Sequence, residues 1–133
     1  MEFLNSQPVS TGSLSCSEDY GIKCQNFEVV VDEIVVAGNI MIMNGSCFIW
    51  LGSGEPRFAN LAMALPTKYD PIPLMTTIIS DEDAAGQHNG LMQRLAAKFH
   101  IQVFQSVNVE LVNEMIWVLI ERKLVEILSS FFP

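Results

Sequence analysis

Residues 34–54 read IVVAGNIMIMNGSCFIWLGSG and carry no charged side chain. This run is about as long as a membrane span, which needs about 20 apolar residues. However, polar residues and glycines interrupt it at Gly38, Asn39 and Asn44-Gly45-Ser46. Asn-Gly is the strongest short hairpin signal, because both central residues of a type I′ turn need a positive φ. The stretch therefore predicts two buried strands, 34–43 and 46–51, joined by a tight turn, rather than a helix in lipid.

Further strands are expected on both sides of this hairpin. The β-branched segment 27–31 precedes it and ends at a predicted turn, Asp32-Glu33, while segments 74–79 and 101–107 follow it. Segment 58–65 is ambiguous, because its alanines favour a helix whereas its short length between two prolines allows a strand.

Two helices complete the expected fold. Leu91, Met92, Leu95, Ala96 and Phe99 recur at intervals of three and four residues, which places them on one stripe of a helix. The C-terminal segment fits two periods: alternation favours a strand from residue 109 to about residue 119, and a helical period favours a helix from there to about residue 130. The sum is a single α+β domain with an antiparallel sheet of about six to seven strands packed with two α-helices.

The composition indicates one domain with surplus apolar surface. A chain of 133 residues suits a single core, which we place at residues 25–130, after a serine-rich flexible leader at 1–24. Charged residues make up 17% of the chain, against about 25% in an ordinary soluble domain. Hydrophobic residues make up 50%. We therefore expect a partner to cover apolar surface that the core does not use.

Charge and cysteine content exclude several kinds of partner and cofactor. The net charge of −8, without any basic patch, argues against nucleic acid and anionic membranes. Cys16, Cys24 and Cys47 match no zinc-site spacing, so the sequence predicts a reduced protein without a metal or other cofactor. The first six residues lack the pattern of a secretory signal, and we expect a cytoplasmic location, with a nuclear one left open.

The sequence offers no constellation that would support catalysis. A small hydrolase would have to use His88 or His100, but no serine or cysteine nucleophile motif accompanies either histidine. Asp81, Glu82 and Asp83 have metal-binding chemistry in principle, but the calcium-loop pattern around them is incomplete. We therefore expect an exposed acidic loop there and no enzyme activity.

Five segments, taken in their order along the chain, resemble the proteasome assembly chaperone 4 family: CFIWLG (47–52), RFANLAMA (57–64), KYDPIP (68–73), GLMQRLAAK (90–98) and QVFQSVN (102–108). The resemblance covers about residues 25–128. It implies a small α+β domain whose antiparallel sheet is backed by two helices, and it implies no catalysis. It also implies a strand at 58–65 and a strand followed by a helix in the C-terminal segment.

The resemblance also implies a function. Family members form a heterodimer with the structurally similar proteasome assembly chaperone 3. Such a pair engages alpha-type subunits around subunit 5, helps to assemble the alpha ring of the 20S proteasome core particle, and leaves before the particle matures. The alternative is a module of another kind, a homodimeric profilin-like or longin-like scaffold without a proteasome connection.

Two groups of residues are our candidates for partner contacts. The first group, expected on neighbouring late strands, is predicted to contribute to the dimer face: Val103, Gln105, Met115 and Trp117. The second group forms the exposed acidic loop and is predicted to steer the encounter with a basic surface: Asp81, Glu82 and Asp83.

Overall fold

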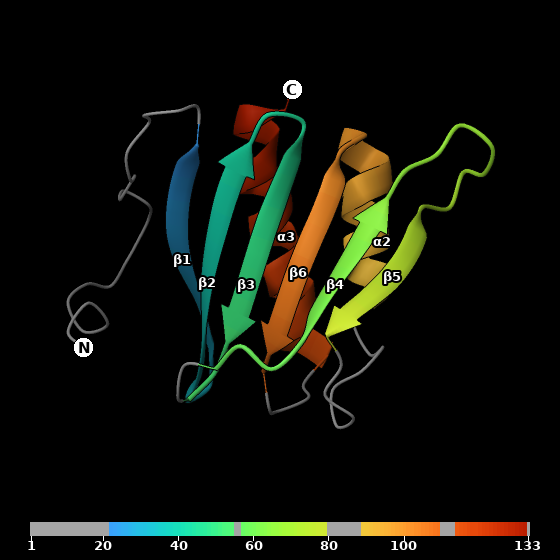
Figure 1. The fold of residues 1–133 in the computed structure, drawn as a ribbon. Coiled ribbons are helices and arrows are strands. Elements are labelled where there is room, and N and C mark those ends of the chain that lie inside the picture. The colour runs from blue at the N-terminus through green and yellow to red at the C-terminus, as the bar shows by residue number, and fades with distance from the viewer. Residues whose placement is uncertain (1–21, 55–56, 80–88, 110–113, 133) are drawn as a thin grey trace.

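The computed structural model describes residues 22–54, 57–79, 89–109 and 114–132 of the chain. In this part of the chain, six strands form one sheet, and two helices lie on one of its faces (Figure 1). The strands are β1 (Lys23–Val31), β2 (Ile34–Met43), β3 (Ser46–Gly52), β4 (Leu61–Leu65), β5 (Leu74–Ile79) and β6 (Gln102–Asn108), and the helices are α2 (Asn89–Phe99) and α3 (Glu114–Phe131). The predicted α+β class is confirmed.

Tight turns connect the first three strands, as the sequence predicts. β2 and β3 pair antiparallel with Met43 opposite Ser46, and Gly45 in the turn between them has a φ of 77°. The turn before β2 places Asp32 at a φ of 59°, in the left-handed region that Asp tolerates better than most residues. Strand β1 begins at Lys23, earlier than expected, and residues 1–21 of the predicted leader lie outside the described residues.

The strand order across the sheet is β1-β2-β3-β6-β4-β5, so β6 is inserted between two strands that precede it in the sequence. It pairs antiparallel with β4 but parallel with β3, where Ser46 lies opposite Gln102. The sheet is therefore mostly antiparallel, and the β3–β6 pair departs from the predicted pattern. A parallel pair needs a long crossover connection, and here β4, β5 and α2 supply it (Figure 1).

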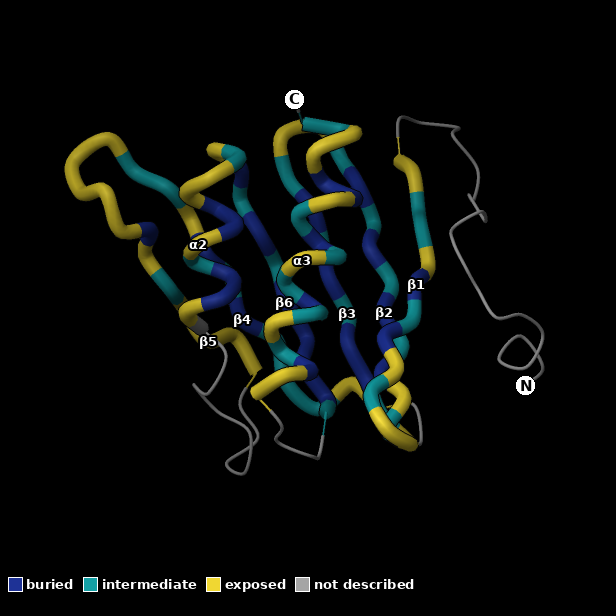
Figure 2. Tube along the Cα trace, turned by 180° about the vertical axis from the view of Figure 1, so that it is seen from behind, coloured by how far each residue is buried: buried dark blue, intermediate teal, exposed yellow. Residues whose placement is uncertain are grey.

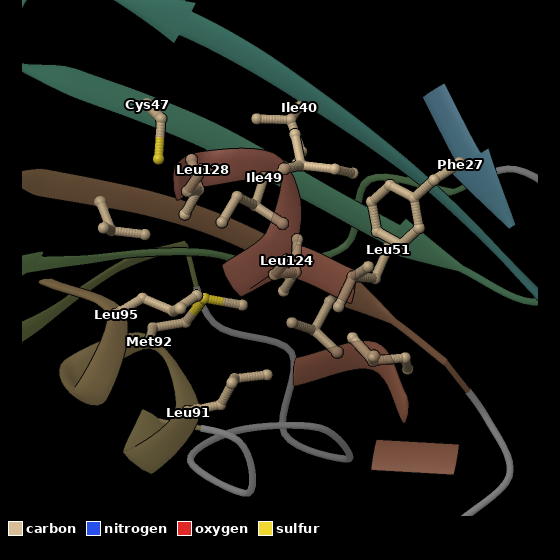
Figure 3. Packing of buried hydrophobic residues seen from close by; sticks show 14 of the residues in the cluster. Phe27, Ile40, Cys47, Ile49, Leu51, Leu91, Met92, Leu95, Leu124 and Leu128 are labelled. Carbon is tan, nitrogen blue, oxygen red and sulfur yellow. The ribbon is translucent and has the colours of Figure 1, made fainter. Parts of the chain in front are cut away.

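The core lies between the sheet and the two helices, which cover the same face (Figure 2). Alternate residues of the strands point toward the helices, and Figure 3 shows Ile40 and Ile49 of the sheet beside Leu124 and Leu128 of α3. These four side chains are completely buried. Near them the Phe27 ring of β1 occupies the space that a Cβ at residue 38 would need, which is why that position is glycine.

The C-terminal segment differs from its prediction. Residues 114–131 form one continuous helix, so the strand expected up to residue 119 is wrong where the structure describes it. The helical stripe of buried residues extends back beyond the predicted start: Ile116, Ile120, Leu124, Ile127 and Leu128. The strand implied at 58–65 is confirmed over Leu61–Leu65. Neither of the two described helices combines the length and the low polarity needed to cross a membrane.

Candidate interaction surface

The sheet face opposite the helices, toward the viewer in Figure 1, carries no helix of the described chain. A row of large apolar side chains crosses it from strand to strand. Met41 of β2 lies opposite Phe48 of β3, Phe48 opposite Phe104 of β6, and Phe104 opposite Met63 of β4. All four are only partly buried, whereas their neighbours along each strand are fully buried beneath the helices. With Trp50 and Phe58, these residues define what we call the open face.

Trp50 and Phe58 connect the segment after β3 to the open face, one through a hydrogen bond and the other through a ring contact. The Trp50 indole Nε1 donates a hydrogen bond to the Arg57 carbonyl oxygen at 2.8 Å. Its ring lies over Gly52, where a Cβ would collide with it. Phe58 packs against Phe48 with ring centroids 6.2 Å apart. The indole therefore lies along the sheet and presents apolar ring to the outside.

Asparagine side chains hold this segment in place. The side-chain amide of Asn60 bonds to the backbone of Val107 as a neighbouring strand would. Its Oδ1 accepts a hydrogen bond from the Val107 N–H at 2.9 Å, and its Nδ2 donates one to the Val107 carbonyl at 2.6 Å. Next to it, the Ala59 N–H donates to Asn108 Oδ1 at 2.9 Å. These bonds tie the start of β4 to the end of β6, and they fix the position of Phe58 on the open face.

Two polar pairs beside the open face are bonded within the chain. Asn39 donates to Asn26 Oδ1 at 2.6 Å, and Gln102 donates to the sulfur of Met63. Burying a polar group costs little when it keeps its hydrogen bond, whereas a group left without a bond is costly. The surface therefore combines aromatic and methionine side chains, which are enriched at protein–protein interfaces, with polar groups that tolerate being covered.

The predicted contact residues do not form one surface. Val103 and Gln105 of β6 are buried, with 0% and 5% exposure, and point toward the helices, so neither is accessible to a partner. Met115 and Trp117 lie on α3 rather than on a strand; Met115 is exposed and Trp117 packs partly buried against the core. Asp81, Glu82 and Asp83 lie outside the described residues.

Phe48 and Phe104 were not predicted as surface residues. The alternation along both strands did separate them from the buried set, with Phe48 opposite in direction to Cys47 and Ile49. The alternation did not show which of the two faces the helices cover.

Two of the reactive groups that the structure describes are the Cys47 thiol and the His100 imidazole, and neither environment is typical of a catalytic group. Burial raises the pKa of the Cys47 thiol to about 12, which keeps it protonated and unreactive at neutral pH. His100 is exposed in the left-handed turn after α2, with a φ of 57°. His88 lies outside the described residues. In the described ranges, no group of His, Cys, Asp and Glu side chains could hold a metal ion.

Comparison with known proteins gives a consistent result. The profile of the family described as "Proteasome assembly chaperone 4" matches residues 35–109. The protein of that name from Mus musculus is 34% identical over 113 residues, covering 85% of this chain and 90% of the relative. The one from Homo sapiens is 33% identical over 110 residues, covering 83% and 88%.

The fold also matches a solved structure. A chain from the "Crystal Structure of a Novel Chaperone Complex for Yeast 20S Proteasome Assembly" superposes with a TM-score of 0.58, covering 83% of this chain and 98% of that chain. At 7% sequence identity this likeness shows the shared fold alone. The sequence relatives are named as assembly chaperones, which is a non-catalytic role. By profile and by identity over most of its length, this chain belongs to the proteasome assembly chaperone 4 family.

Proposed function

We propose that this protein is an assembly chaperone that pairs through its open face with a proteasome assembly chaperone 3-like protein. The pair promotes formation of the 20S alpha ring by binding alpha-type subunits around subunit 5. The observation that carries the proposal is the row from Met41 through Phe48 and Phe104 to Met63, which no helix of the described chain covers. Family membership supports a role in proteasome assembly.

The shape of the open face suits a sheet rather than a helix as its partner. Two sheets that pack face to face lie about 10 Å apart, with side chains of the facing surfaces interdigitating. The flat indole of Trp50 and the rings of Phe48 and Phe104 supply such a layer without a projecting charge. A structurally similar partner would present its own sheet, and the pair would form a sandwich with helices on both outer sides.

A cytoplasmic location, with the nucleus left open, is part of the proposal. The buried thiol of Cys47 is not in a disulfide, which is compatible with a reducing compartment.

The test replaces Phe104 by aspartate in the centre of the open face. Burying an unpaired carboxylate costs about 3–5 kcal/mol, so pairing with the chaperone 3-like protein should weaken by more than about 100-fold. The control is Val118→Asp on α3, since Val118 is exposed and faces away from the sheet. Native mass spectrometry would measure pairing with the partner and with purified alpha-type subunits, and circular dichroism would check that both variants are folded.

Three outcomes would contradict the proposal. Pairing of a folded Phe104→Asp variant at wild-type affinity would remove the open face from the interface. A wild-type chain that pairs only with itself and captures no alpha-type subunit would favour the homodimeric scaffold. Equal loss in the Val118→Asp control would place the interface on the helices instead.

A further inference from the structure

A second apolar surface lies away from the open face, on the connection between β4 and β5. This loop, residues 66–73, projects beyond one end of the sheet beside its last strand (Figure 1). Tyr69 is 93% exposed and Ile72 is 62% exposed. Leu74, the first residue of β5, is also exposed. The KYDPIP segment is one of those that carry the family resemblance, yet the core makes no use of these side chains.

The loop is restrained by prolines and hydrogen bonds despite its exposure. Proline occupies positions 66, 71 and 73, and each proline fixes its own φ. Asp70 Oδ1 accepts a hydrogen bond from the Ile72 N–H at 2.9 Å, and Gln93 of α2 donates to the Pro73 carbonyl at 2.8 Å. An exposed tyrosine on a restrained loop loses little conformational entropy on binding, which is the property of a pre-organised anchor.

The exposed area limits the kind of partner that the loop can serve. A large aromatic side chain buries about 150–250 Å², so Tyr69 with Ile72 and Leu74 supplies roughly 300–500 Å². A stable complex buries about 800 Å² on each partner. By themselves, these three side chains are therefore too small to hold a permanent subunit or a second copy of this chain, and their area suits a partner that is later released.

We propose that the β4–β5 loop contacts the alpha-type subunit, with the ring of Tyr69 inserted into an apolar pocket of that subunit. This inference rests on the proposed function and adds the client surface to it. The exposed Lys68 and Asp70 flank the tyrosine. The matching pocket therefore has a carboxylate on one side and a basic group on the other. The partner chaperone and the client then occupy different surfaces of one chain.

The test measures the affinity of the intact chaperone pair for a purified alpha-type subunit. Replacing Tyr69 by alanine should raise the Kd about 10- to 100-fold, the usual effect of removing an interface anchor. Tyr69→Phe should change it less than about threefold, because the ring supplies most of the contact. Val118→Ala on α3 removes another exposed apolar side chain, 53% exposed, and should change nothing. Pairing with the chaperone partner, measured in parallel, should be unaffected in all three variants.

Several results would overturn the inference. An unchanged Kd for Tyr69→Ala would remove the loop from the client surface while the proposed function stands. A Tyr69→Phe loss as large as that of alanine would mean a hydroxyl contact instead of an inserted ring. Loss of partner pairing in Tyr69→Ala would assign the loop to the other interface. If the wild-type pair binds no alpha-type subunit, the proposed function fails and the inference fails with it.

Discussion

Replacing Gly52 by alanine tests whether the geometry of Trp50 determines partner binding. A Cβ at this position would lie 2.7 Å from Cζ2 and 3.1 Å from Cζ3 of the indole, with Cη2 closer still. The indole must therefore rotate off the sheet, and its hydrogen bond to the Arg57 carbonyl is lost. The ring would then project into the space that a facing sheet needs.

The expected effects on stability and on binding differ in size. Losing a hydrogen bond costs about 0.5–1.5 kcal/mol. Gly52 does not have a positive φ, so once the indole has moved, replacing glycine by alanine gains about 0.4–1 kcal/mol through the unfolded chain. The free energy of unfolding should therefore change by less than about 1 kcal/mol. Misplacing an interface tryptophan costs about 2 kcal/mol or more, which corresponds to a Kd for the partner at least about 30-fold higher.

The assay uses a Trp117→Phe background, so that fluorescence reports Trp50 alone. The emission of Trp50 should shift toward that of a more exposed indole, the urea midpoint should hardly move, and titration with the partner should show the weaker Kd. Gly90→Ala on α2 is the matched control, because it makes the same chemical change with only the end of the Arg94 side chain nearby. Unchanged Trp50 emission together with an unchanged Kd would refute the reasoning.

Three other predictions concern the core and its edges. Asn60→Asp removes the donor to the Val107 carbonyl and should lower the free energy of unfolding by about 1–3 kcal/mol in urea titrations; an unchanged value would mean that water replaces the bond. The Cys47 thiol, with a pKa raised to about 12 by burial, should resist alkylation in the native protein and react only after unfolding, as peptide mapping would detect; rapid native labelling would contradict the packing. The hydrogen bond from Arg94 holds the pKa of Glu121 below its usual value of 4.5, so this pair stabilises the folded state above that pH and the contribution is lost as the pH falls through the lowered pKa. Glu121→Gln should therefore cost less than about 1 kcal/mol at neutral pH, because the pair is partly exposed, and nothing in acid; thermal melts that show the same loss at both pH values would exclude the charge effect.

Local signals in the sequence predicted the strands well. The bounds of β2 and β5 agree with the prediction, because an Asn-Gly turn and flanking prolines mark strand ends within a few residues. The start of α3 was mispredicted because Met115, Trp117 and Leu119 alternate by coincidence, while the buried Ile116 that begins the helical stripe falls between them. The parallel β3–β6 pair joins distant segments, so no local pattern encodes it.

The interaction surface was harder to predict for a related reason. Alternation assigns the residues of β6 to two faces, but it does not say which face receives the helices. In β6, side-chain polarity predicts the wrong face as the core, since Gln105 faces the core while Phe104 faces outward. Only the packed structure, with both helices on one side, identifies the outer set (Figure 2).

The insertion of β6 between β3 and β4 has a consequence for synthesis. On the ribosome, the first five strands emerge before the one that joins them, so they can pair only as a β1–β2–β3 meander and a separate β4–β5 hairpin, and the β3 and β4 edges wait for β6. Closing such a long-range pairing is slow compared with forming a hairpin. Because Phe104 comes from this late strand, the aromatic row is completed only when the domain closes, and we expect the proposed pairing through the open face to be post-translational.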